Sequence, residues 1–262
     1  MRSAFSRTIA GLVLGAAALA PPAGADEWDE GSDPDRGVST DNVLFHGSEQ
    51  THDLGVQIGF VPDQDWYLVS VRPFSSYQFV ADAFTGDLDL TATGVQRLNG
   101  TQVLQQDAAV LEGGGVLSLS WFRGAGATDE TNFVRVAGAA CTQFCNNLDT
   151  YRARFYDTTY TIPRFNNSGT QTTVLLLQNT TDRNCTLTMF FLNGSGALLF
   201  NPSEAMGPHG LLVVPTAAFA ANASGSVRIA HTCGYGGLSG KAVSVEPATG
   251  FTFDTPVLHR PH

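Results

Sequence analysis

The sequence has few charged residues, and it almost lacks lysine. Charged side chains make up 15% of the 262 residues, and only one of the 14 cations is a lysine, Lys241. The 24 acidic residues bring the net charge to −10, and the cations form no cluster. Nucleic-acid binding needs clustered cations that neutralise phosphates. The composition therefore argues against a nucleic-acid partner.

Long apolar runs are absent after the first 25 residues. Arg2 and Arg7 precede an apolar run from Ile9 to Ala20, and Ala23-Gly24-Ala25 offers the small residues that a signal peptidase accepts. The run is shorter than the roughly 20 residues that a membrane-spanning helix needs. We expect residues 1–25 to be a cleaved signal peptide, with no membrane span after it. The protein is then secreted, to the periplasm or to the cell exterior.

Cysteine is also scarce, with four residues in the chain. In an oxidising compartment four cysteines allow three pairings. Cys141 and Cys145 flank a three-residue loop, which favours a local disulfide and leaves Cys185 to pair with Cys233. A zinc site is the alternative, but no His-x-His or second Cys-x-x-Cys pattern adjoins these positions.

The segment from Asp26 to Asp41 differs from the rest in composition. It carries seven acidic residues and one arginine, with glycine, serine and proline between them. Such a stretch buries too little apolar surface to offset the entropy lost on ordering. We expect residues 26–41 to be a disordered acidic leader.

The remaining sequence has the alternation of β-strands. In Thr150–Tyr156, Tyr151, Ala153 and Phe155 alternate with arginines, and Leu117, Leu119 and Trp121 alternate with serines. Glycine-rich turns such as Asn193–Gly196 separate the runs, and no sustained helical stripe occurs beyond a short turn at Thr216–Ala221. We predict an all-β protein of two consecutive β-sandwich domains of jelly-roll or immunoglobulin-like type, at residues 42–158 and 159–262. Thr159–Pro163 is the expected hinge, because the proline ends a ladder.

An ordered series of short motifs in the first domain resembles the bacterial pre-peptidase C-terminal domain. The series consists of Asp63-Gln64-Asp65-Trp66-Tyr67, Tyr77-Gln78-Phe79, Gly86-Asp87-Leu88-Asp89-Leu90, Asn132–Val136 and Tyr151–Arg154. The resemblance covers about residues 41–157 and implies a β-sandwich that accompanies secreted bacterial proteins. Phe133 stands where that family usually has tyrosine, and no peptidase precedes the domain. The second region is similar in style to immunoglobulin-like modules of secreted bacterial proteins.

Four aspartates form a candidate calcium site. Asp87 and Asp89 lie on one expected turn, and Asp63 and Asp65 on another. Calcium takes six to eight oxygen ligands, which carboxylates on adjacent loops supply. The pre-peptidase resemblance also implies calcium, because members of that family bind it through acidic residues. The alternative is that aspartate favours turns through local hydrogen bonds. No other cofactor is expected.

Aromatic side chains outside the expected cores are candidates for ligand contact. Trp66 and Trp121 fall in strand runs and are expected in the core, whereas Tyr156, Tyr160, Phe165 and Tyr235 are candidate surface rings. A polar cluster lies on a segment that enters a strand, and we interpret it as a polar loop and not as a metal site, because its two histidines have no third anchoring ligand. The cluster consists of His46, Glu49, His52 and Asp53.

These observations favour a secreted, non-enzymatic binding, accessory or adhesion-type protein, with an extracellular protein or polysaccharide surface as partner. No His, Asp and Ser occur in a recognisable catalytic setting. Two alternatives stay open. One is a secreted hydrolase or lyase that acts on polysaccharide or peptide from a sandwich scaffold, which predicts a cleft with convergent carboxylates. The other is a periplasmic assembly or inhibitor protein, which predicts an uncovered strand edge.

Overall fold

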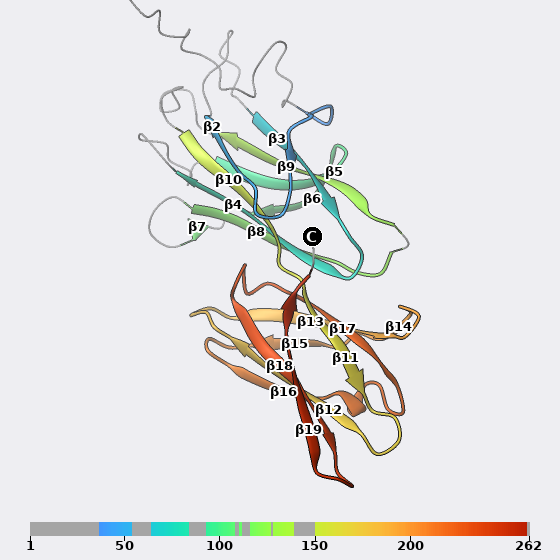
Figure 1. Ribbon diagram of the computed structural model, residues 1–262. Helices are drawn as coiled ribbons and strands as arrows, with labels where there is room; N and C mark the ends of the chain where they lie inside the picture. The colour runs from blue at the N-terminus through green and yellow to red at the C-terminus, as the bar shows by residue number, and fades with distance from the viewer. Residues whose placement is uncertain are drawn as a thin grey trace, which may run out of the picture.

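The computed structural model confirms the all-β prediction. It describes residues 37–53, 64–83, 93–107, 110–111, 116–126, 128–138 and 150–260. Within these ranges the regular elements are strands, apart from one 3-10 turn, η2 (Thr216–Ala218), where the sequence predicts a short turn. Figure 1 shows two sandwiches placed end to end, and the chain passes from the first to the second between β10 and β11.

Two five-stranded sheets form the first sandwich. Their strand orders are β1-β3-β9-β5-β6 and β2-β10-β4-β8-β7. The pairings are antiparallel except for β1, which pairs with β3 in parallel. The strands are β1 (Val43–Leu44), β2 (Glu49–Asp53), β3 (Gln64–Val71), β4 (Ser75–Ala83), β5 (Thr93–Asn99), β6 (Gln102–Asp107), β7 (Val110–Leu111), β8 (Val116–Arg123), β9 (Glu130–Gly138) and β10 (Thr150–Asp157).

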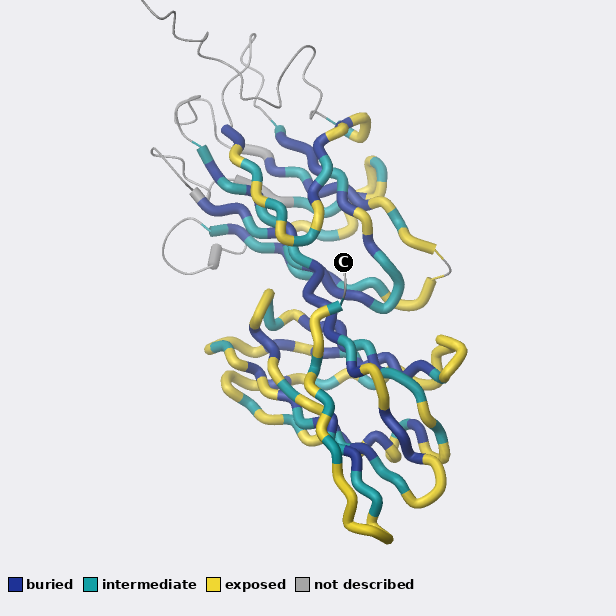
Figure 2. Tube along the Cα trace, viewed as in Figure 1, coloured by how far each residue is buried: buried dark blue, intermediate teal, exposed yellow. Residues whose placement is uncertain are grey.

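Alternating side chains account for the core of the first sandwich. On β10, Tyr151, Ala153 and Phe155 are buried, as the alternation predicts. The arginines between them face outward, where Arg152 and Arg154 both form ion pairs with Asp82 on β4. The inward rings pack on one another, with Tyr77 and Phe155 stacked at 5.6 Å between ring centres. Figure 2 shows buried residues running through the middle of each sandwich.

The second sandwich repeats this design with unequal sheets. One sheet has the order β14-β13-β17-β11-β20, with β15 also paired to β13, and the other has the order β16-β12-β18-β19. Its hairpin between β13 and β14 turns at Asn193–Gly196, as predicted, and Gly196 has a φ of 83° that favours glycine. The strands are β11 (Tyr160–Asn166), β12 (Thr172–Asn179), β13 (Cys185–Asn193), β14 (Leu198–Phe200), β15 (Ser203–Met206), β16 (Leu211–Pro215), β17 (Ser224–His231), β18 (Leu238–Glu246), β19 (Phe251–Pro256) and β20 (Leu258–His259).

The predicted hinge at Thr159–Pro163 is wrong from Tyr160 onward, because residues 160–163 belong to strand β11 and only Thr159 lies in the connection between the sandwiches. The pairing of β11 with β17 moves from Ile162 opposite Val227 to Phe165 opposite Gly225, so β11 carries one extra residue. Pro163 lies in this bulge. A proline has no N–H to donate to the ladder, and a bulge is a place where a strand tolerates it.

The folded part begins earlier than predicted. Thr40, which the sequence assigns to the acidic leader, is buried, and its Oγ1 donates a hydrogen bond to the carbonyl of Trp66 over 3.0 Å. The next residues continue into the fold, since Leu68 N donates to the carbonyl of Asn42. The predicted signal peptide and residues 26–36 of the predicted leader lie outside the described residues.

The disulfide between Cys185 and Cys233 is present, as predicted. Cys185 is the first residue of β13, and Cys233 lies two residues beyond the end of its neighbour β17. The bridge therefore fastens two paired strands at one end of their sheet. The predicted partners Cys141 and Cys145 lie outside the described residues.

Candidate binding site at the junction of the two sandwiches

The connection between the sandwiches is short and buried. Only Thr158 and Thr159 separate β10 from β11, and both are buried. Both form hydrogen bonds with Ser76 of β4. Thr158 Oγ1 donates to Ser76 Oγ over 2.8 Å, and Ser76 N donates to Thr159 Oγ1 over 3.0 Å. The backbone of Thr158 also donates to the carbonyl of Ser76. The connection is therefore part of the packed structure.

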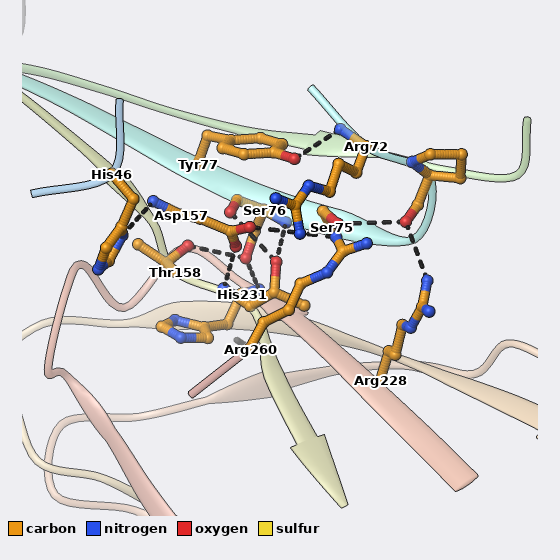
Figure 3. A network of polar contacts seen from close by, with 12 residues as sticks. His46, Arg72, Ser75, Ser76, Tyr77, Asp157, Thr158, Arg228, His231 and Arg260 are labelled. Atoms are coloured by element: carbon orange, nitrogen blue, oxygen red, sulfur yellow. Dashed lines mark hydrogen bonds and ion pairs between the residues drawn. The ribbon is translucent and has the colours of Figure 1, made fainter. Parts of the chain in front are cut away.

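Polar contacts join the second sandwich to β4 across the junction (Figure 3). His231 N donates to Ser76 Oγ over 3.0 Å, and Tyr235 N donates to Gln78 Oε1 over 2.8 Å. From the C-terminal end of the chain, Arg260 reaches back to donate to Ser75 Oγ. These contacts come from three separate segments of the second sandwich, so they restrict rotation as well as separation.

An apolar cluster supports the same junction from another side. Phe190, Leu192 and Ala230 of the second sandwich pack against Phe74 and Phe122 of the first. The rings of Phe74 and Phe190 lie 5.1 Å apart. Polar and apolar contacts together hold the two sandwiches in one relative orientation.

His231 is a buried ionisable group of this junction. Its ring stacks on Tyr160 at 5.4 Å, and its Nδ1 accepts a hydrogen bond from Cys233 N over 3.2 Å. Burial lowers the pKa of His231 to about 4, because it disfavours the charged imidazolium; the nearby His259 lowers it further, and a backbone contact with Thr158 partly opposes this. The ring is therefore neutral at physiological pH.

Four further rings form a strip beside this buried histidine. Tyr156 of the first sandwich and Tyr235 of the second stack at 4.4 Å with an angle of 11°. His46 meets Tyr235 edge-on at 5.5 Å, and His259 lies 5.4 Å from Tyr235 on another side. Tyr235 is 46% exposed. We call His46, Tyr156, Tyr235 and His259 the ring strip.

The sequence prediction of surface rings is correct in part. Tyr235 is exposed, Tyr156 is half-buried, and the structure brings the two together. Tyr160 is wrong as a surface candidate, because it is buried, with its ring centre 4.4 Å from that of His259. Phe165 is wrong as a surface candidate, because it is fully buried in the core of the second sandwich against Phe191.

A pocket of about 390 Å³ adjoins the ring strip on the first sandwich. Its polar groups include Arg72, Asp129 and Asp157, and Phe45 at its edge is 70% exposed. Arg72 N donates to the hydroxyl of Tyr77 over 2.6 Å, and burial, together with the charge of Asp157, raises the pKa of that hydroxyl. The volume of the pocket falls in the range of small-ligand sites. The lining residues are Val43, Leu44, Phe45, His46, Ser70, Arg72, Tyr77, Asp129, Phe155 and Asp157.

The structure describes one of the four predicted calcium ligands. Asp63, Asp87 and Asp89 lie outside the described residues. Asp65 lies within β3, not on a turn, and its carboxylate is buried and accepts a hydrogen bond from Tyr151 Oη. Within the described ranges, no three or more His, Cys, Asp or Glu side chains gather in a way that could hold a metal ion.

Removing the Tyr151 hydroxyl tests the role of Asp65 in the core. Tyr151 Oη contacts both Asp65 and the hydroxyl of Tyr67, the latter at 2.6 Å. We expect Tyr151→Phe to lower the free energy of unfolding by about 2 kcal/mol, because a buried carboxylate loses a donor. Urea denaturation followed by Trp66 and Trp121 fluorescence measures this. An unchanged midpoint would show that Asp65 is satisfied without Tyr151.

No protein-family model matches the chain, and no curated protein matches it. Among solved structures, the extracellular region of zebrafish Gpr126/Adgrg6 is similar at 10% identity and a TM-score of 0.24. It covers 81% of this chain and 30% of its own. A calcium-binding mutant of Bacteroides uniformis beta-glucuronidase 2 is similar at 12% identity and a TM-score of 0.22, covering 78% of this chain and 27% of its own.

The chain thus spans less than a third of these larger structures, and similarities of this size carry no argument about function. No helix within the described ranges is long and apolar enough to cross a membrane.

Proposed function

We propose that this chain is a secreted, non-enzymatic binding protein of accessory or adhesion type, which holds an extracellular polymer along the ring strip. The first 25 residues are cleaved on export, and residues 41–157 resemble the pre-peptidase C-terminal domain. The Cys185–Cys233 disulfide supports an oxidising compartment.

One observation carries the proposal: the ring strip is built from both sandwiches. Tyr156 comes from β10 and Tyr235 from the turn before β18, and their stacking joins the two domains at the surface. Tyrosines at a surface, here the exposed Tyr235 and the half-buried Tyr156, offer a flat apolar face and a hydroxyl, the combination that is enriched at binding surfaces. The contacts beneath the strip hold the rings in place, so less ordering entropy is lost when a ligand binds.

Binding to immobilised polymers tests the proposal. The secreted protein is incubated with insoluble polysaccharides and with extracellular matrix proteins, and the bound fraction is measured at increasing protein concentration. We expect binding to at least one of these surfaces, weakened at least tenfold by Tyr156→Ala combined with Tyr235→Ala, which corresponds to about 1.4 kcal/mol.

Phe251→Ala is the matched control. Phe251 is 62% exposed and begins β19, after the hairpin at the end of the second sandwich that lies away from the first (Figure 1). We expect this variant to bind as the unaltered protein does. Equal weakening by Phe251→Ala would contradict a site at the junction and point to nonspecific adsorption through exposed rings.

A further inference from the structure

The pocket and the ring strip form one continuous surface, because His46 belongs to both. His46 lines the pocket, and its ring also lies edge-on to Tyr235 at 5.5 Å and to Tyr156 at 6.1 Å. Its Nδ1 accepts a hydrogen bond from Asp157 N over 3.0 Å, which fixes the ring between the two regions. A chain-like ligand that enters the pocket beside Phe45 can therefore continue over the tyrosines without leaving the surface.

The charged groups at the pocket cancel one another. Asp129 and Asp157 line it together with Arg72, and Arg260 lies 4.0 Å from Asp157 on the side of the junction. The Asp157 carboxylate also accepts a hydrogen bond from Thr159 N over 2.9 Å. A polyanion would meet two carboxylates in the pocket of a protein whose net charge is already −10, and a polycation would meet the arginines. The electrostatics favour an uncharged ligand.

The polar groups suit vicinal hydroxyls. A carboxylate accepts hydrogen bonds only and a guanidinium donates only, whereas a hydroxyl does both. Adjacent hydroxyls of a sugar can thus donate to Asp129 and accept from Arg72 at once. The exposed rings of Phe45 and Tyr235 offer apolar faces for the C–H side of a sugar ring.

We propose that the pocket takes one disaccharide unit of an uncharged polysaccharide, and that the next units of the chain lie over Tyr156 and Tyr235. This inference rests on the proposed function and adds the class of the ligand and the path of the polysaccharide over the protein surface. Phe45, Arg72 and Asp129 hold the unit in the pocket, and the tyrosine pair holds its neighbours. The boundary between the sandwiches is thus part of the binding surface.

Isothermal titration calorimetry with neutral oligosaccharides tests the inference. The probes are the disaccharides and hexasaccharides of glucose, N-acetylglucosamine, xylose and mannose, each β-1,4-linked. We expect at least one hexasaccharide to bind more tightly than its disaccharide. Phe45→Ala should weaken both lengths at least tenfold, and Asp129→Asn several-fold, because the amide donates where the carboxylate accepts. Phe251→Ala is the control and should change neither.

Tyr235→Ala distinguishes binding in the pocket from binding over the ring strip, because Tyr235 belongs to the ring strip and does not line the pocket. It should weaken the hexasaccharide at least tenfold and leave the disaccharide unchanged, because a disaccharide occupies the pocket alone. Equal weakening of both lengths would overturn the proposed path of the chain.

Binding of charged polysaccharides or of a protein would contradict the choice of an uncharged polysaccharide as the ligand. If polygalacturonate, a sulfated glycan or gelatin binds through the ring strip and no neutral hexasaccharide does, the saccharide inference is overturned while the proposed function stands. If none of these probes and no immobilised polymer binds, both are overturned.

Discussion

Replacing Cys185 and Cys233 together with alanine is expected to lower the free energy of unfolding of the second sandwich by about 4 kcal/mol. The bridge spans 48 residues of sequence, and closing a loop of this length removes considerable entropy from the unfolded chain. The bridged segment contains β13 to β17, from which most of one sheet is built. The bridge links the start of β13 to the end of β17, so these two strands cannot separate at that end while the bridge is intact.

Urea denaturation with two optical signals measures this effect. Trp66 and Trp121 lie in the first sandwich, Trp28 lies outside the described residues, and residues 159–262 contain no tryptophan. Fluorescence therefore does not follow the second sandwich, whereas far-ultraviolet circular dichroism follows both sandwiches. The dichroism transition of the double variant should move to lower urea. Thr186→Ala with Thr232→Ala, beside the two cysteines, is a control that keeps the bridge. A double-cysteine variant as stable as the unaltered protein would contradict the prediction.

Acidification from pH 7 to pH 4 is expected to destabilise the protein by about 3 kcal/mol through His231. The folded-state pKa is about 4, whereas an unfolded histidine has a pKa near 6.5. Above pH 6.5 the ring is neutral in both states and the effect is absent. As the pH falls from 6.5 to 4 the unfolded chain takes up a proton that the folded protein does not, and the free energy of unfolding falls by about 1.4 kcal/mol per pH unit. Below pH 4 the loss levels off.

Comparing the unaltered protein with His231→Asn isolates this contribution. Urea midpoints are measured at pH 7, 6, 5 and 4 for both proteins. The variant is expected to be less stable at pH 7, because it loses the ring contact with Tyr160, yet to have a shallower pH slope. Parallel slopes would show that the acid sensitivity comes from other groups.

Side-chain alternation explains why much of the fold could be predicted. Tyr151, Ala153 and Phe155 on β10 and Leu117, Leu119 and Trp121 on β8 show the period of two, and the structure buries all six. Very short strands such as β1 and β20 have too few residues to show a period. The sequence does not predict β11, because a proline lacks the N–H that a strand donates to its neighbour. The bulge that accommodates Pro163 depends on the pairing with β17, which the sequence of β11 alone does not indicate.

The candidate site was less predictable because it is made by contacts between distant segments. The period of β10 places Tyr156 on the outer face, but nothing in the sequence indicates that Tyr235 stacks on it. Ser76, Thr158 and Thr159 are small polar residues with no pattern, and their burial follows from hydrogen bonds to one another. The sequence predicts a polar loop at His46, but the pocket that His46 lines is formed by residues of β1, β3, β4 and β10, which are far apart in the sequence.

The buried connection of Thr158 and Thr159 also bears on how such a protein can evolve. Domains joined by a loose linker can be exchanged by gene recombination, because a crossover in the linker disturbs neither fold. Here a crossover at this point would leave Ser76 and Gln78 facing a new module without His231 N or Tyr235 N to satisfy them. A replacement module would have to supply these donors at once. The two sandwiches are therefore expected to be inherited as a single unit.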